Sequence, residues 1–203
     1  MKIPTERMTF AYAAAAALIL LVFAAYMFAN RSGGPAGSGI PLIGGPFTLV
    51  DQDGRQVTEA NFRGRFMLIY FGYTYCPDVC PTTLTTMADA VRLLGADEPK
   101  VVPIFITVDP QRDTPDHLKM YVGYFHPRMV GLTGSAEQAA ASAKAFRVYY
   151  AKVEDKEAPP DSDAYVMDHT SIVYLMGPDG RFLSNFGHGA TPEQIAAKTK
   201  EFM

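Results

Sequence analysis

Cysteine is scarce in this sequence, and there is no excess of positive charge. Only two cysteines occur among 203 residues, too few for a disulfide-dense secreted scaffold or a self-contained four-cysteine zinc site. Lys and Arg number 18 against 21 Asp and Glu. Without a basic excess to neutralise a phosphate backbone, we expect no nucleic-acid binding. The length leaves no room for a large multidomain enzyme, while a hydrophobic fraction of 48% predicts a folded core.

Residues 8–29 contain no charged side chain and predict a single transmembrane anchor. As a helix this run would be about 33 Å long, which spans a bilayer. A cleavable signal peptide is the alternative, but cleavage after Ala29 would put Met27 where a small residue is required. A buried core helix is disfavoured because a polar linker follows the run. We therefore expect an uncleaved anchor.

The charges beside this run predict its orientation. Lys2 and Arg7 precede it, whereas Arg31 follows it, and this bias favours residues 1–7 on the cytoplasmic or matrix side. Residues 30–39 are rich in glycine and serine and predict a flexible linker. Residues 40–203 are then one domain on the far side of the membrane.

The domain alternates apolar runs with helical patterns. Continuous apolar runs predict buried strands, and threonine followed by proline predicts helix starts at Thr114-Pro115 and Thr191-Pro192. Predicted strands cover 47–50, 55–58, 66–71, 101–108, 129–132, 148–153, 171–176 and 181–186, and predicted helices cover 81–94, 115–125, 135–146 and the segment after 191. The class is mixed α/β with helices on both faces, and a strand, a cysteine turn, a helix and a strand match a thioredoxin-like domain.

Cys76 and Cys80 directly follow the predicted strand at 66–71 and lie where a helix begins. Unpaired N–H groups and the helix dipole there favour the thiolate, the form that attacks disulfides and binds metals. A plain stabilising disulfide is the alternative, but a bridge across so short a loop removes little chain entropy. Asp78, between the two cysteines, is either a solvated turn residue or a group that tunes the thiolates.

A histidine could join the cysteine pair, and composition does not choose among the four that are present. Two of them, His117 and His126, lie in or at the end of a predicted helix, and His188 lies in a loop. His169 follows a long polar loop at the mouth of a strand, and loops carry function more often than cores do. Two thiolates and an imidazole suit copper better than structural zinc, which takes four ligands. Met167 is either a further thioether ligand or a core residue.

Three segments carry a resemblance to a known family. They are YFGYTYCPDVCP at 70–81, VDPQRDTP at 108–115 and DHT at 168–170. In this order they closely resemble the SCO/SenC family of copper proteins. The resemblance implies copper ligation by Cys76, Cys80 and His169 in a thioredoxin-like domain. This domain would face the periplasm at the inner membrane of a bacterium, or the intermembrane space of mitochondria. The resemblance also implies a role in assembling the copper-A centre of cytochrome c oxidase, with the oxidase subunit that carries this centre and a copper donor protein as partners.

Several functions stay open on the residues alone. The leading hypothesis is a copper chaperone, and the second is a thiol-disulfide oxidoreductase in which Cys76 and Cys80 are the catalytic redox pair that reduces the target's cysteines. A thioredoxin-like peroxidase and a passive anchored interaction domain are weaker alternatives. His169 stands where thioredoxins place a proline, which favours metal binding. The acidic stretch 154–163 is either a solvated loop or a mobile segment that lets His169 move. Asp109, Arg112 and Asp113, near the cysteine end of the sheet, either give structural support or take a direct part in the chemistry.

Overall fold

The computed structural model describes residues 18, 20–23, 43–154 and 164–203. Its contacts divide the chain into two units, 1–41 and 42–203. In the first unit, residues 18 and 20–23 are helical. The predicted anchor at 8–29 therefore lies mostly, and the predicted linker at 30–39 entirely, outside the described residues. No helix within the described part of the chain combines the length and the apolar content needed to cross a membrane.

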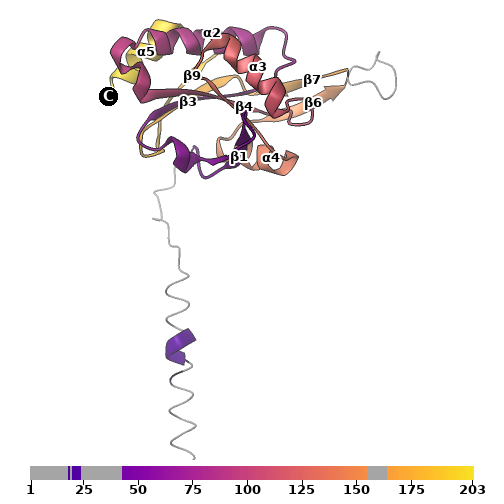
Figure 1. Ribbon diagram of the computed structural model, residues 1–203, viewed down its shortest axis with the longest axis vertical. Helices are drawn as coiled ribbons and strands as arrows, with labels where there is room; N and C mark the ends of the chain where they lie inside the picture. Colours follow the sequence, from indigo (N-terminus) through magenta and orange to yellow (C-terminus); the bar gives the residue numbers. More distant parts are fainter. Residues whose placement is uncertain (1–17, 19, 24–42, 155–163) are drawn as a thin grey trace, which may run out of the picture. The chain divides into compact units, whose positions relative to one another are not determined.

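A seven-stranded mixed sheet forms the centre of the second unit, as far as residues 43–154 and 164–203 describe it (Figure 1). Its order is β2-β1-β5-β4-β3-β8-β9, with β3, β4 and β5 parallel and the other neighbours antiparallel. The strands are β1 Thr48–Asp51, β2 Gln56–Thr58, β3 Phe66–Gly72, β4 Val101–Thr107, β5 Val130–Thr133, β8 Ile172–Met176 and β9 Phe182–Gly187. The predicted thioredoxin-like α/β class is confirmed.

The central strands β3 and β4 are buried at every residue, as their unbroken apolar runs predict. Pro103 lies inside β4, although proline cannot donate to a ladder. It precedes Ile104, where pairing with β5 begins, so its missing N–H is not needed on that side. This central strand can therefore contain a proline without losing a hydrogen bond to β5.

Helices cover both faces of the sheet. They are α2 Val79–Arg92, α3 Pro115–Phe125, α4 Ala136–Ala145 and α5 Pro192–Lys200, with short 3-10 turns η1 Glu59–Phe62 and η2 Gly95–Lys100. Figure 1 shows α2, α3 and α5 on one face and α4 on the other. Both predicted threonine caps are confirmed, because Thr114 accepts a hydrogen bond from the backbone of His117 and Thr191 from that of Gln194.

A second, two-stranded sheet differs from the sequence prediction. Strand β6 Tyr150–Glu154 was expected, but its partner β7 Tyr165–His169 was not, since the sequence predicted a strand only from residue 171 onward. The two strands pair with each other and project from one side of the main sheet (Figure 1). Alternation along β7 buries Tyr165 and Met167 and turns Val166 outward. His169 therefore shares the inward-facing side.

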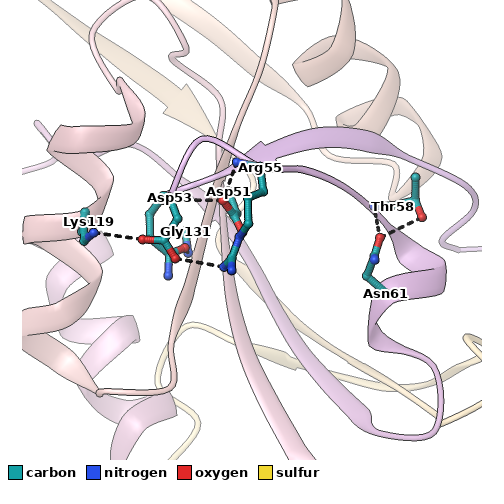
Figure 2. Close-up of polar contacts among 8 residues, drawn as sticks. Asp51, Asp53, Arg55, Thr58, Asn61, Lys119 and Gly131 are labelled. Carbon is teal, nitrogen blue, oxygen red and sulfur yellow. Dashed lines mark hydrogen bonds and ion pairs between the residues drawn. The ribbon is translucent and has the colours of Figure 1, made fainter.

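Ion pairs fix the turn between β1 and β2 against the face that carries α3 (Figure 2). Asp51 is 4% exposed and accepts from the backbone of Asp53 and from both the backbone and the guanidinium of Arg55, each at 2.9 Å. Lys119 of α3 lies 3.0 Å from the Asp53 carboxylate and, mainly through a hydrogen bond, lowers the pKa of that carboxyl. The turn is thus tied to α3 away from the cysteines.

Candidate metal centre

The two cysteines lie where β3 passes into α2. β3 ends at Gly72 and α2 begins at Val79, so Cys76 lies in the connecting loop and Cys80 in the first helical turn. Both are free thiols, with Cys76 partly buried and Cys80 fully buried. Gly72 leaves space for them, because a Cβ there would lie 2.7 Å from the Cys80 Sγ.

Strand β7 brings His169 to these sulfurs. The ligand atoms of Cys76, Cys80 and His169 all lie within 4.8 Å of one another, and among the described residues no other group of three His, Cys, Asp or Glu converges in this way. The Cys80 Sγ lies 3.4 Å from the His169 Nε2. The structure therefore brings together all three residues that the sequence analysis singled out.

Contacts around its ring hold His169 with Nε2 facing the sulfurs. Its Nδ1 lies 3.2 Å from the carbonyl oxygen of Thr170. A carbonyl only accepts, so Nδ1 is the nitrogen that donates in this contact, and Nε2 is the nitrogen placed to offer a lone pair to a metal. Tyr70 and Tyr73 meet the imidazole edge to face, at centroid distances of 6.0 and 5.9 Å.

The two thiols differ strongly in acidity. A hydrogen bond from the Cys80 thiol, aided by backbone N–H groups of Asp78 and Cys80 and by His169, lowers the pKa of Cys76 to about 5 against the effect of burial. The same hydrogen bond, together with burial, raises the pKa of Cys80. Without a metal, the pair therefore holds one proton on the buried sulfur and a thiolate on the accessible one. The backbone of Asp78 contributes here, and its carboxylate does not cap α2.

The segment after β4 supports the cysteine loop, which is one of the two roles left open for its residues. Asp113 is fully buried and accepts from the backbone N of Thr74 at 3.1 Å, from its hydroxyl at 2.6 Å, and from the hydroxyl of Thr107 at 2.5 Å. Because Thr74 lies two residues before Cys76, the Asp113 carboxylate holds the loop that carries Cys76 in place.

The other three histidines, all within the described residues, lie outside this group. His126 is buried 3.4 Å from Glu98, and the ring of His117 packs on Tyr75 at 5.3 Å. His188 lies in the loop after β9, and Met167 is a buried core residue. Most of the acidic stretch 154–163 lies outside the described residues.

The donor set suits a soft metal ion. Thiolate sulfur and imidazole nitrogen favour copper, whereas calcium and magnesium need oxygen ligands. A structural zinc site would need a fourth ligand, and among the described residues no fourth side chain of these types joins the group. Copper therefore fits these residues.

Comparison with known proteins gives the same family from sequence and structure. Residues 36–203 match SCO1/SenC. Protein SCO1 homolog, mitochondrial, of Homo sapiens is 44% identical over 168 residues, 81% of this chain and 54% of that protein. The chain spans between 45% and 60% of the length of the first curated relatives it matches.

Solved structures of similar fold also come from this family. Bradyrhizobium japonicum ScoI with copper bound is 46% identical and superposes with a TM-score of 0.71, covering 79% of this chain and 99% of that one. BsSco, described with a disulfide switch as a member of the Sco family of cytochrome c oxidase assembly proteins, is 30% identical with a TM-score of 0.59, covering 80% and 95%. By sequence, fold and site, this chain belongs to the SCO1/SenC family.

Proposed function

We propose that this chain is a copper chaperone for the assembly of cytochrome c oxidase. In this proposal the copper ion is cargo, held by the sulfurs of Cys76 and Cys80 and the Nε2 of His169. The convergence of these three atoms within 4.8 Å carries the proposal. The copper in the Bradyrhizobium relative and the oxidase-assembly role stated for the BsSco family support it.

The two sulfurs have different parts in delivery. Cys80 is fully buried behind Cys76, so the accessible sulfur of Cys76 is where ligands of a recipient protein approach the metal. The recipient is the oxidase subunit that carries the copper-A centre. A copper donor protein would load the site from the same side.

Copper content in two redox states tests the proposal. We expect the reduced domain to bind about one copper ion and the form with a Cys76–Cys80 disulfide to bind none, because only thiolate sulfur is a ligand. His169→Ala should retain less copper than the wild type, whereas the control His188→Ala, which also loses an imidazole, should match it. Equal copper content in both redox forms would refute the site.

Thiol-disulfide exchange is the second candidate function. An acidic, accessible Cys76 beside a buried, protonated Cys80 is the asymmetry that exchange requires, since one sulfur attacks and the other resolves the mixed disulfide. The reaction would oxidise this pair to a disulfide and reduce a disulfide of the target, so that the target's cysteines can accept copper.

We further propose that residues 8–29 anchor the protein and that 40–203 face the periplasm or the intermembrane space, with residues 1–7 on the opposite side and 30–39 as the linker. The uncharged run and the flanking charges support this topology. A reporter fused after Met203 should be active only outside the cytoplasm. Cytoplasmic reporter activity would contradict it.

A further inference from the structure

The strand that carries His169 is not part of the main sheet. Among the described residues, β7 pairs only with β6, from Tyr150 opposite His169 to Glu154 opposite Tyr165. In contrast, Cys76 lies in the loop after β3, a central strand of the main sheet, and Cys80 lies in the first turn of α2. The C-terminal end of β7 is joined through Thr170 and Ser171 to β8, a strand of the main sheet. The distance from His169 to the sulfurs therefore depends on this link and on the side-chain contacts that attach the rest of the β6–β7 hairpin to the body.

Three side chains make this attachment at the opposite end of β7. The hydroxyl of Tyr165 donates to Asp109 Oδ1 at 2.8 Å in a buried hydrogen bond. Arg112 donates from Nη1 to the carbonyl oxygen of Tyr165 at 3.1 Å, and its guanidinium lies 3.5 Å from the centre of the Tyr165 ring. Arg112 and Asp109 are joined by an ion pair at 2.5 Å. We call Asp109, Arg112 and Tyr165 the hairpin clamp.

The clamp also reaches the cysteine loop. The Arg112 guanidinium lies 4.6 Å from the ring centre of Tyr75 and 5.8 Å from that of Tyr73. These aromatic rings precede Cys76, and a desolvated cation over an aromatic face is an attractive contact. One arginine thus touches both the segment that carries the cysteines and the strand that carries His169.

From this geometry we propose that Arg112 and Tyr165 are positioning residues that set the distance between His169 and the two cysteines. Neither side chain is a ligand. They fix the start of β7, and the strand carries that placement over four residues to His169. Weakening the clamp lets the hairpin move, so that the imidazole leaves the sulfurs while the cysteine pair stays in place.

The first test needs no metal. Tyr165→Phe removes only the hydroxyl bonded to Asp109 and keeps the ring under Arg112. In the reduced, metal-free protein we expect amide hydrogen exchange to become faster across β7 and to stay unchanged in β3. Tyr149→Phe, which removes an exposed hydroxyl beside the same hairpin, is the control and should behave as the wild type. Unchanged protection of β7 in Tyr165→Phe would overturn the proposal.

The second test rests on the proposed copper function. We expect Tyr165→Phe to weaken copper binding about 10-fold, the scale of losses when a residue that orients a ligand is changed. In a His169→Ala background the same substitution should have no effect, because the clamp acts through His169. This is a double-mutant cycle. A loss that persists without His169 would overturn the proposal, since a general loss of stability would act in both backgrounds.

The two tests separate the clamp from the proposed function. If the wild type binds no copper, the proposed function fails, and hydrogen exchange of β7 still decides whether the clamp positions the strand. Arg112→Gln removes more contacts and should give larger effects in both assays. If it does not fold, Tyr165→Phe alone gives the result.

Discussion

At the scale of single residues, the site distinguishes two cysteines that are only four positions apart. Cys76 is partly exposed and accepts a hydrogen bond from the backbone N of Cys80 at 3.4 Å. Cys80 is fully buried, with the Tyr70 hydroxyl 3.9 Å from its sulfur. Because N–H donors favour a thiolate and burial disfavours it, the negative charge is held at Cys76.

This asymmetry predicts selective chemistry at Cys76. In the reduced, metal-free protein, iodoacetamide should modify Cys76 rapidly at neutral pH and Cys80 slowly. Since the pKa of Cys76 is lowered to about 5, its modification rate should stay constant as pH falls from 8 to about 6 and then decrease through pH 5. Mass spectrometry of peptides after timed quenching measures both rates. Equal rates at the two cysteines, or a midpoint near the ordinary pKa of about 8.5, would contradict the assignment.

The motifs of the sequence identified the three candidate ligands, but not the contacts that hold them in place. Cys76, Cys80 and His169 belong to short motifs that can be seen in a single sequence. Arg112 was expected near the cysteine end of the sheet, as a structural support or a participant in the chemistry, but with no partner named. Its contact with Tyr165 joins positions 53 residues apart, and local spacing holds no information about such a contact.

At the scale of elements, the end of β3 decides whether the cysteines fit. Gly72 is the last residue of this strand, and a Cβ there would lie 2.7 Å from the Cys80 Sγ and 2.9 Å from the Phe105 ring. Gly187 ends β9 in the same way, but a Cβ there would meet nothing within 4 Å. Both glycines end a strand and only Gly72 is crowded, so Gly187 is a matched control for a substitution at Gly72.

We expect Gly72→Ala to lower the free energy of unfolding by about 1–3 kcal/mol, the usual cost of overpacking a core, and to reduce copper retention because the Cys80 sulfur must shift. Gly187→Ala should change stability by no more than about 0.5 kcal/mol. Urea unfolding of the reduced proteins measures the first effect, and copper content the second. Equal stability of the two variants would show that the β3 end can relax.

The elements of the main sheet could be predicted because their signals are local. Apolar runs give β3 and β4, and Thr-Pro pairs give the starts of α3 and α5. Strand β7 was missed because its five residues, YVMDH, place the apolar Val166 outward, which breaks the expected alternation of polar and apolar positions. Its partner β6 also lies across a long polar segment, so no tight-turn signal marks the hairpin.

At the scale of the whole molecule, the site combines residues from two separate parts of the fold, the main sheet with its helices and the β6–β7 hairpin. The cysteines pack in or against the buried core around β3 and α2, whereas His169 comes from a hairpin whose described residues pair with no strand of the main sheet. The two proposed functions can therefore be separated by position, because in these proposals disulfide exchange needs only the cysteine pair, whereas copper retention needs the hairpin as well.

A single substitution should separate these two functions. We expect His169→Ala to weaken copper retention and to leave the rate of reduction of a model disulfide nearly unchanged, because thiolate attack requires only the sulfurs and the start of α2. The variant should remain folded, since the ring is only partly buried at the edge of the core. Cys76→Ser and Cys80→Ser should each lose both activities. Copper stoichiometry and the exchange rate, measured on one preparation of each variant, give the answer. If His169→Ala kept its copper and lost its exchange rate, His169 would be an acid-base group of an oxidoreductase and not a copper ligand.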